Sequence, residues 1–309
     1  MMREWEGESI VILDFGSQYT QLIARRVRAE DVFSVILPHS AGIEDIRAEK
    51  PKGLILSGGP ADLTEESAPR LKADIFSLGI PVLGICYGMQ LISQMKGAEL
   101  ERSGHREFGH TKIEADTDTT LFRGTPTEQK VWMSHGVRLK SAPEGFVTNA
   151  SSTGCPIAAM SNDEERIYGL QFHPEVFHTE NGIGILQNFL FEVCGCDRVW
   201  SSKSFVDLEV SRIREMVGNE RVLCAVSGGV DSSVMAALVD KAIGKQLVPV
   251  FVDNGLLREN EAEEVQDILA GCLTTELVFV DAADEFLAKL DGVTDPETKR
   301  KIIGTTFID

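Results

Sequence analysis

The sequence predicts an α/β protein with two domains: a doubly wound, mostly parallel sheet with antiparallel additions, then a second, incomplete parallel α/β domain. Three observations support this class. Apolar runs alternate with helical stretches over residues 9–95, which is typical of a parallel sheet covered by helices on both faces. Short segments rich in Val, Ile and Thr follow, and a new alternation begins at Val222. A chain of 309 residues is also long enough to form about two cores.

Composition narrows the classes of partner. The apolar content of 43% and the charged content of 25% are typical of a soluble globular protein. The net charge of −18 argues against nucleic acid and membrane partners, because both require a basic face. The negative charge does not argue against nucleotides as ligands, since backbone amides can hold phosphates without a net positive charge. Six cysteines and an acidic start without a signal peptide predict reduced thiols in the cytoplasm.

The elements of the first domain follow in order along the chain. A continuous apolar strand is expected from Ser9 to Phe15, with a helical stretch after it to Arg28. Residues 98–170 are expected to form antiparallel strands packed on one side of the sheet, and a closing helix is expected over Asn181 to Val193. Further strands are expected over Val32 to Leu37, Gly53 to Leu56 and Ile80 to Ile85, and further helices over Ile43 to Glu49, Ala68 to Leu78 and Met89 to Met95.

Cys86 lies on a sharp turn between the strand that ends at Ile85 and the helix that includes Met89, which predicts a nucleophile elbow. Gly84 and Gly88 lack the Cβ atoms that would clash there, and Gly88 can adopt a backbone conformation that other residues avoid. Helix-end amides or a neighbouring imidazole can convert such a thiol into a thiolate. A small, buried structural cysteine is the alternative interpretation.

Two further stretches carry candidate chemistry. The amides of Ser57-Gly58-Gly59-Pro60, with the amide after Cys86, could form an oxyanion hole, although an ordinary Gly-Pro turn is the alternative. Glu175 lies two residues after His173, so in an extended segment its carboxylate can orient the imidazole. Cys86, His173 and Glu175 then form an acyl-transfer triad. A structural His–Glu pair and a metal site with His178 are the alternatives.

The second domain begins with a predicted phosphate-binding loop. The apolar strand Val222 to Val226 runs into Ser227-Gly228-Gly229-Val230-Asp231-Ser232-Ser233 at the start of a helix, and glycines, hydroxyls and a helix N-terminus favour a phosphate. The loop lacks the lysine of the common P-loop, and a Ser-Gly-rich turn is the alternative. We place the first domain at residues 1–197, a linker at 198–206 and the second domain at 207–309. Helices are expected over Val206 to Val217 and Glu259 to Leu269, and strands over Leu247 to Val252 and Glu276 to Val280.

Four stretches together resemble the class I glutamine amidotransferase family. They are SGGP with Gly59, GICYGMQ with Cys86, MSHG at residues 133–136, and GLQFHPE with His173 and Glu175. The resemblance implies that Cys86 attacks the side-chain amide of glutamine to give a glutamyl thioester, ammonia and glutamate, with His173 as general base and acid and Glu175 orienting it.

The same resemblance implies roles for the residues around the triad. The amides of Gly59 and Tyr87 would hold the oxyanion, and Gln90 and Ser134 would lie near glutamine. Val137 stands where the family has aspartate, which puts glutamine affinity or the coupling of the domains in doubt. The triad is untouched by this departure.

The loop SGGVDSS resembles the pyrophosphate-binding loop of the Rossmann-like ATP pyrophosphatases. With LDFGSQYTQLIARRVR at 13–28, FVDNGLLR at 251–258 and DPETKRKIIG at 295–304, the sequence resembles the glutamine-hydrolysing GMP synthetase family. That family converts XMP, ATP and glutamine to GMP, AMP, pyrophosphate and glutamate. Magnesium accompanies the ATP, and no tightly bound cofactor is implied.

The resemblance places ligands in the second domain. It implies that residues 227–233 bind the ATP phosphates, with Asp231 near the magnesium and Asp253 near the nucleotide. Lys299 and Lys301 would lie on a mobile segment over the phosphates, although a solvated helix face would have the same pattern.

The family continues beyond the position of Asp309, so we expect an N-terminal portion with the glutaminase, part of the synthetase and no dimerisation domain. Full-length members would be homodimers. Thr305 stands where arginine is expected. The alternatives are a glutaminase that serves a separate synthetase chain, and a non-catalytic nucleotide-binding or assembly protein.

Overall fold

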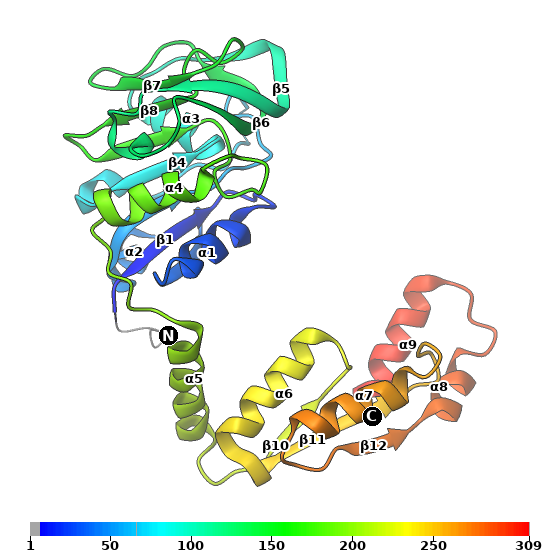
Figure 1. Cartoon of the computed structure of the whole chain (residues 1–309). Helices are drawn as coiled ribbons and strands as arrows, with labels where there is room; N and C mark the ends of the chain where they lie inside the picture. The colour runs from blue at the N-terminus through cyan, green and yellow to red at the C-terminus, as the bar shows by residue number, and fades with distance from the viewer. Residues whose placement is uncertain (1–6, 66, 309) are drawn as a thin grey trace. The chain divides into compact units, whose positions relative to one another are not determined.

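The computed structural model describes residues 7–65 and 67–308, and the chain divides into two compact units, Met1–Ser201 and Ser202–Asp309 (Figure 1). In the first unit the apolar runs form strands and the segments between them form helices, in the order β1 Ser9–Asp14, α1 Thr20–Ala29, β2 Ser34–Pro38, α2 Ile43–Ala48, β3 Pro51–Leu56, the 3₁₀ helix η1 Ile75–Leu78, β4 Val82–Ile85 and α3 Tyr87–Met95. The strands β5 Leu100–Ala115, β6 Glu128–Leu139, β7 Val147–Ser151, β8 Ala159–Asn162 and β9 Ile167–Leu170 follow, interrupted by the 3₁₀ turn η2 Thr120–Phe122.

The nine strands of this unit form a single sheet in the order β2-β1-β3-β4-β9-β8-β7-β5-β6. The first five strands in this order are parallel, and the last four pair in antiparallel fashion. The predicted fold class is therefore confirmed. The expectation that residues 98–170 pack on one side of the sheet is wrong, because these strands extend its edge. Strand β9 pairs with β4 from Val82↔Ile167 to Ile85↔Leu170, so the two segments that carry the predicted triad are neighbours.

Helices cover both faces of the parallel part. On one face α1 and the closing helical segment pack against one set of alternating side chains of the central strands, including Ile10 and Ile55. On the other face α2, η1 and α3 pack against the other set, including Leu13 and Leu54. The closing segment consists of α4 Gly182–Gln187 and a π-helical turn, η3 Asn188–Val193, within the range predicted for one helix.

The prediction of a helix over Ala68 to Leu78 is wrong, since only the last four residues of this range form a helix, the 3₁₀ helix η1. Tertiary contacts replace the helical hydrogen bonds of the preceding segment. The carbonyl of Pro69 accepts a hydrogen bond from the Tyr87 hydroxyl, and Arg70 donates to the carbonyl of Leu63 at 3.2 Å. Pro69 also has no N–H group to donate.

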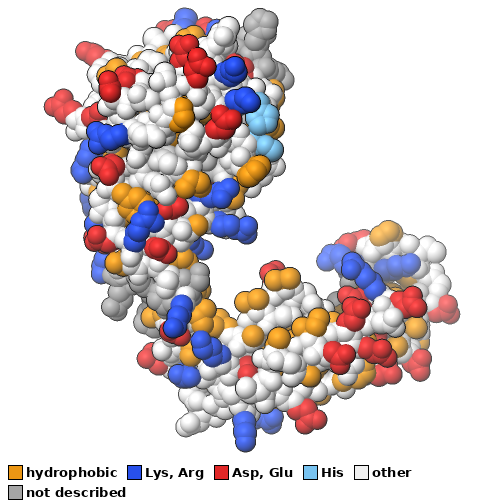
Figure 2. Space-filling model, in the orientation of Figure 1, with side chains coloured by type: hydrophobic (Ala, Val, Ile, Leu, Met, Phe, Trp, Pro, Cys, Tyr) orange, Lys and Arg blue, Asp and Glu red, His pale blue; other side chains and the backbone are white. Residues whose placement is uncertain are grey.

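The second unit contains a parallel three-stranded sheet in the order β10-β11-β12. Figure 2 shows apolar side chains exposed along this unit, and among the described residues Leu223 (73%) and Val230 (78%) are strongly exposed. Among the described residues no helix of either unit is long and apolar enough to cross a membrane. The elements are α5 Ser202–Val217, β10 Val222–Ala225, α6 Val230–Ile243, η4 Gly244–Gln246, β11 Leu247–Asp253, α7 Glu261–Cys272, β12 Val278–Asp281, α8 Ala283–Leu290 and α9 Pro296–Ile308. Helix α5 begins at Ser202, inside the range predicted as a linker, because its helical pattern extends further toward the N-terminus than expected.

Candidate active site

Cys86 lies between β4 and α3 with φ 51° and ψ −105°, a backbone conformation that a residue with a Cβ atom rarely adopts. Its amide donates to the carbonyl of Leu170 in β9 at 2.7 Å, and its carbonyl accepts from Gln90 in the first turns of α3 at 3.1 Å. These bonds hold the strained residue at the N-terminus of the helix. The predicted elbow is present, but the residue with positive φ is Cys86 and not Gly88.

The two glycines of the elbow are required by close packing. A Cβ atom on Gly84 would lie 2.5 Å from the backbone of Gly88, and one on Gly88 would lie 2.4 Å from the carbonyl oxygen of Leu56. Both clashes involve backbone atoms, which cannot rotate away. Strand β3, strand β4 and helix α3 therefore approach each other as closely as they do because neither position has a side chain.

His173 and Glu175 follow β9 and complete the predicted triad. The Nδ1 atom of His173 lies 2.7 Å from Oε1 of Glu175, and the Glu175 side chain is fully buried. Burial lowers the pKa of His173, but its hydrogen bonds with Cys86 and Glu175 outweigh burial and raise the pKa to about 10. His173 therefore carries a proton at neutral pH beside the Cys86 sulfur.

The substitution Glu175→Gln is expected to lower the pKa of His173, because it removes the carboxylate that hydrogen-bonds and attracts the imidazolium. Since the folded pKa of about 10 lies above the ordinary 6.5, the stability from this interaction is complete below about pH 6.5 and is lost as the pH rises toward 10. In the Glu175→Gln variant the pKa of His173 lies closer to 6.5, so the stability that its protonation contributes should be smaller and should be lost at lower pH than in the unaltered protein. An NMR titration of the imidazole measures the pKa directly.

Glu192→Gln is the matched control, because Glu192 is an exposed carboxylate in the same unit, 3.8 Å from Arg123. It should leave the titration of His173 unchanged. An unchanged titration in Glu175→Gln would mean that the carboxylate does not hold the proton on His173.

Cys86 opens into a cavity of about 650 Å³. Gly59, Tyr87, Gln90 and Ser134, the residues predicted around the triad, all line this cavity. A second, adjoining cavity of about 380 Å³ reaches Cys86 and His173 from the side of residues 16–19. The Cys86 thiol faces the carbonyl oxygen of Ser134 at 3.6 Å. The structure thus brings all the predicted residues of the first domain to one site, with Glu175 behind His173.

Gln171 is a site residue that the sequence analysis did not single out. Its Nε2 lies 3.7 Å from the Cys86 sulfur, and its Oε1 accepts from Nε2 of Gln90 at 3.2 Å. Gln90 also donates to the backbone carbonyl of Val137 at 2.8 Å, a bond that does not depend on the side chain at that position. The alternation of side chains in GLQFHPE, which places Gln171 on the same side as His173, is the signal that could have found it.

The metal alternative with His178 does not match the geometry. The His178 ring stacks on Trp132 with ring centroids 4.6 Å apart, whereas the His173 ring forms a T-shaped pair with Tyr19, with centroids 5.1 Å apart. The cluster of possible metal ligands that the described residues contain is a different one, Glu107, His135 and Cys155.

The predicted phosphate loop lies at the carboxyl edge of the second sheet, in the exposed turn between β10 and α6. Gly228 has φ +76°, and a Cβ atom there would lie 2.3 Å from Val265. The Ser227 amide donates to Oγ of Ser232 at 3.2 Å, and that hydroxyl donates to the carbonyl of Gly229. These bonds fold the turn back onto the first residues of α6.

Asp253 ends β11 and is in register with Asp281 at the end of β12, so both carboxylates lie at the same edge of the sheet as the loop. Asp231 is exposed in the first turn of α6. Lys299 and Lys301 are on exposed positions of α9, where Lys301 lies 3.8 Å from Glu297.

Comparison with known proteins defines the class of this protein. The sequence model of the family described as Glutamine amidotransferase class-I matches residues 11–193, which contain Cys86, His173 and Glu175. The chain belongs to the class I glutamine amidotransferase family.

Particular relatives carry a more specific name. The chain is 51% identical over 303 residues to the GMP synthase (glutamine-hydrolyzing) of Bacillus cereus, a match that covers 98% of this chain and 59% of that protein. The protein of the same name from Oceanobacillus iheyensis is 54% identical over 302 residues, with the same coverage. The chain thus spans 59% of the length of these curated relatives. A solved crystal structure, described as a GMP synthase subunit from Thermoplasma acidophilum, is 34% identical with a TM-score of 0.54, and the match covers 60% of this chain and 94% of that one.

Proposed function

We propose that this chain hydrolyses glutamine at Cys86 and supplies the ammonia for the synthesis of GMP from XMP and ATP. One observation carries the glutaminase part of this proposal. A thiol at a strained elbow faces a cavity of about 650 Å³ and hydrogen-bonds a histidine that a buried carboxylate orients. Nucleophile, proton carrier and orienting group in this arrangement are what acyl transfer requires.

The chemistry follows from the protonation of His173. The Cys86 sulfur attacks the amide carbon of glutamine as a thiolate, whose proton resides on His173, and the C–N bond breaks as His173 gives that proton to the leaving nitrogen, which departs as ammonia. The neutral imidazole then takes a proton from water, whose oxygen attacks the thioester carbon and displaces the sulfur. Glutamate leaves, and the site returns to its first state. Amides at Gly59 and Tyr87 would stabilise the oxyanion at both additions.

The lining of the cavity includes charges of both signs, which suits a free amino acid. Arg102 lies 3.0 Å from Asp62 and 3.9 Å from Glu65, and all three residues line the cavity. The α-carboxylate of glutamine could pair with the guanidinium, and its α-ammonium group with a carboxylate. This pairing supports glutamine over a simple amide as the substrate.

The synthetase part of the proposal concerns the second unit and the curated relatives. Residues 227–233 present amides and hydroxyls at the N-terminus of the 14-residue helix α6, where a phosphate is favoured. Asp231 and Asp253 are oxygen ligands of the kind that magnesium prefers when it accompanies ATP. Cytoplasmic location and homodimerisation of the full-length protein stay predictions.

Glutamate release from glutamine, measured with and without ATP and XMP alongside an assay for GMP, tests the proposal. We expect this chain to release glutamate, and the assay for GMP measures separately whether it also carries out the ligation. GMP formation would show that the residues present suffice for ligation. Absence of glutamate together with failure of a thiol-reactive glutamine analogue to label Cys86 would favour a non-catalytic binding protein.

A glutaminase that serves a separate synthetase chain is the second candidate. The Thermoplasma acidophilum protein is described as one subunit of a synthase, and 94% of its chain matches. The second unit with its phosphate loop favours the first candidate, because a separate glutaminase does not need one.

A further inference from the structure

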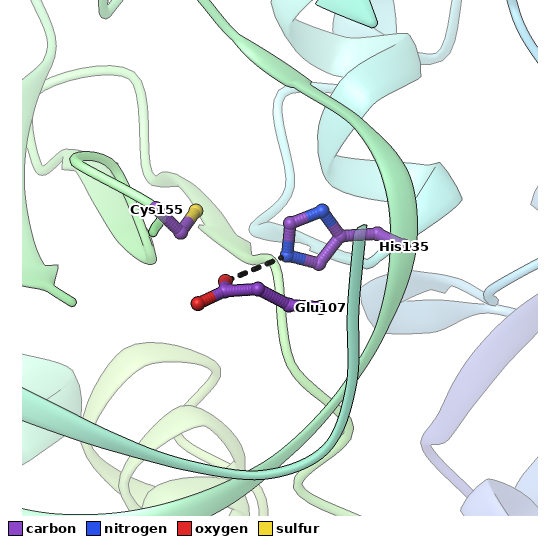
Figure 3. A group of neighbouring side chains, drawn as sticks. All are labelled: Glu107, His135 and Cys155. Carbon is purple, nitrogen blue, oxygen red and sulfur yellow. Dashed lines mark ion pairs between the residues drawn. The ribbon is translucent and has the colours of Figure 1, made fainter. Parts of the chain in front are cut away.

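A buried group of three side chains lies next to the active site but outside the proposed mechanism. Glu107 in β5 and His135 in β6 are directly opposed across the antiparallel pair, and Cys155 lies in the segment between β7 and β8. Figure 3 shows the three side chains pointing toward one another. One ligand atom from each residue lies within 4.8 Å of the other two.

Two of the three side chains, Glu107 and His135, have buried polar atoms without a hydrogen-bond partner among the described residues. The side chain of His135 is 1% exposed, and its Nε2 lies 3.3 Å from Oε2 of Glu107. Neither atom has a hydrogen-bond partner of good geometry among the described residues. The two atoms face each other as an ion pair whose geometry is poor for a hydrogen bond, and a cation between them would satisfy both.

The geometry points to a divalent cation of the zinc class, and we propose that Glu107, His135 and Cys155 bind one. A carboxylate oxygen, an imidazole nitrogen and a thiolate are the mixed donor set that zinc accepts, whereas magnesium and calcium prefer oxygen alone. Two ligand atoms at about 2.0–2.1 Å from a tetrahedral zinc lie about 3.3 Å apart. This separation agrees with the 3.3 Å between His135 and Glu107.

Cys155 would bind with loss of its proton. The Cys155 thiol donates to the carbonyl of Ile157 at 3.3 Å, and a bound cation would replace that proton. The nearby cation Arg138 opposes metal binding, but its guanidinium is paired with Glu101 at 2.8 Å. The charge of the bound cation would be offset by the carboxylate and the thiolate.

The position of the site defines its role. His135 directly follows Ser134, whose carbonyl faces the Cys86 thiol at 3.6 Å, and both residues line the glutamine cavity. A cation that links β5, β6 and the β7–β8 segment would fix this wall of the cavity. The site is therefore structural, and it rests on geometry that is independent of the glutaminase proposal.

Cobalt(II) binding by the Cys86→Ala variant tests the proposal. This substitution removes the thiol beside His173, which could otherwise bind the metal at the active site. We expect the metal-free protein to take up one Co²⁺ per chain with a sulfur-to-cobalt absorption band in the near ultraviolet, and Zn²⁺ to displace it. Adding Cys155→Ser should abolish the band and weaken binding at least about 100-fold. Cys272→Ser is the matched control, since Cys272 is an exposed thiol outside the group, and it should leave the band unchanged.

A second measurement covers the case in which Cys155→Ser does not fold. The melting temperature of the Cys86→Ala protein should fall when Zn²⁺ is chelated and recover when Zn²⁺ returns. A sulfur-to-cobalt band that persists in Cys155→Ser, or the absence of both the band and the zinc-dependent melting shift, would overturn the proposal.

Discussion

Replacing Cys86 by alanine is expected to lower the rate of glutamate release by about 10³-fold or more, because Cys86 is the only thiol among the described residues that line the two cavities. Gln171 lies 3.7 Å from the sulfur, but its amide nitrogen is not a nucleophile. The measurement is the initial rate of glutamate formation at saturating glutamine. A rate close to that of the unaltered protein would refute Cys86 as the nucleophile.

Cys86→Gly is the control that separates the chemistry from backbone strain. Alanine has a Cβ atom, so it retains the conformational strain of φ 51° at this position, whereas glycine adopts that conformation without strain. The glycine variant should therefore be about 1 kcal/mol more stable than the alanine variant, with both inactive. Equal stability of the two variants would mean that the elbow relaxes when the thiol is removed.

Gly88→Ala is expected to lower the free energy of unfolding of the first unit by about 3–5 kcal/mol. The added Cβ atom would lie 2.4 Å from the carbonyl oxygen of Leu56, so helix α3 and strand β3 must separate. Cys86 stands at the N-terminus of that helix, and the triad would lose its geometry as well. Urea unfolding followed by circular dichroism measures the loss.

Gly184→Ala is the matched control in the same unit. Gly184 lies inside α4, and an added Cβ atom would make only an ordinary contact of 3.9 Å with Thr125. Because alanine favours a helix over glycine, this substitution should be neutral or stabilise the unit by up to about 1 kcal/mol. A similar loss in both variants would show that the close approach at Gly88 is not the cause.

The sequence predicted the features that depend on local pattern. Apolar runs such as Ser9 to Phe15 specify buried parallel strands wherever they stand, and the turn at Cys86 needs its flanking glycines within a few residues. The parallel, doubly wound arrangement of the first strands also follows, since strands that alternate with helices favour it. The residues predicted around Cys86 are accordingly found at a single cavity.

The remaining features depend on contacts between distant parts of the chain. Residues 68–74 have helical composition, but the Tyr87 hydroxyl takes the carbonyl of Pro69 and the helix does not form. The cluster of Glu107, His135 and Cys155 arises from the register of β5 with β6 and from a loop between other strands. Neither the missing helix nor the cluster can be predicted from the spacing of residues along the sequence. The sequence also predicts the unusual backbone conformation at Gly88 and not at Cys86, because glycine is the residue that usually adopts a positive φ.

The pairing of β4 with β9 has a consequence for how the site comes into being during folding. Cys86 follows β4 and His173 follows β9, and Gln171, which contacts the sulfur, is separated from Cys86 by 85 positions in the chain. Closing so long a loop is slow compared with forming the helices and the β1–β4 units. The turn at Cys86 can therefore form before β9 is in place, but the bond from its amide to Leu170 and the approach of His173 arrive only when the centre of the sheet closes. Partly folded chains, including those still being synthesised before β9, then contain the thiol but not the triad.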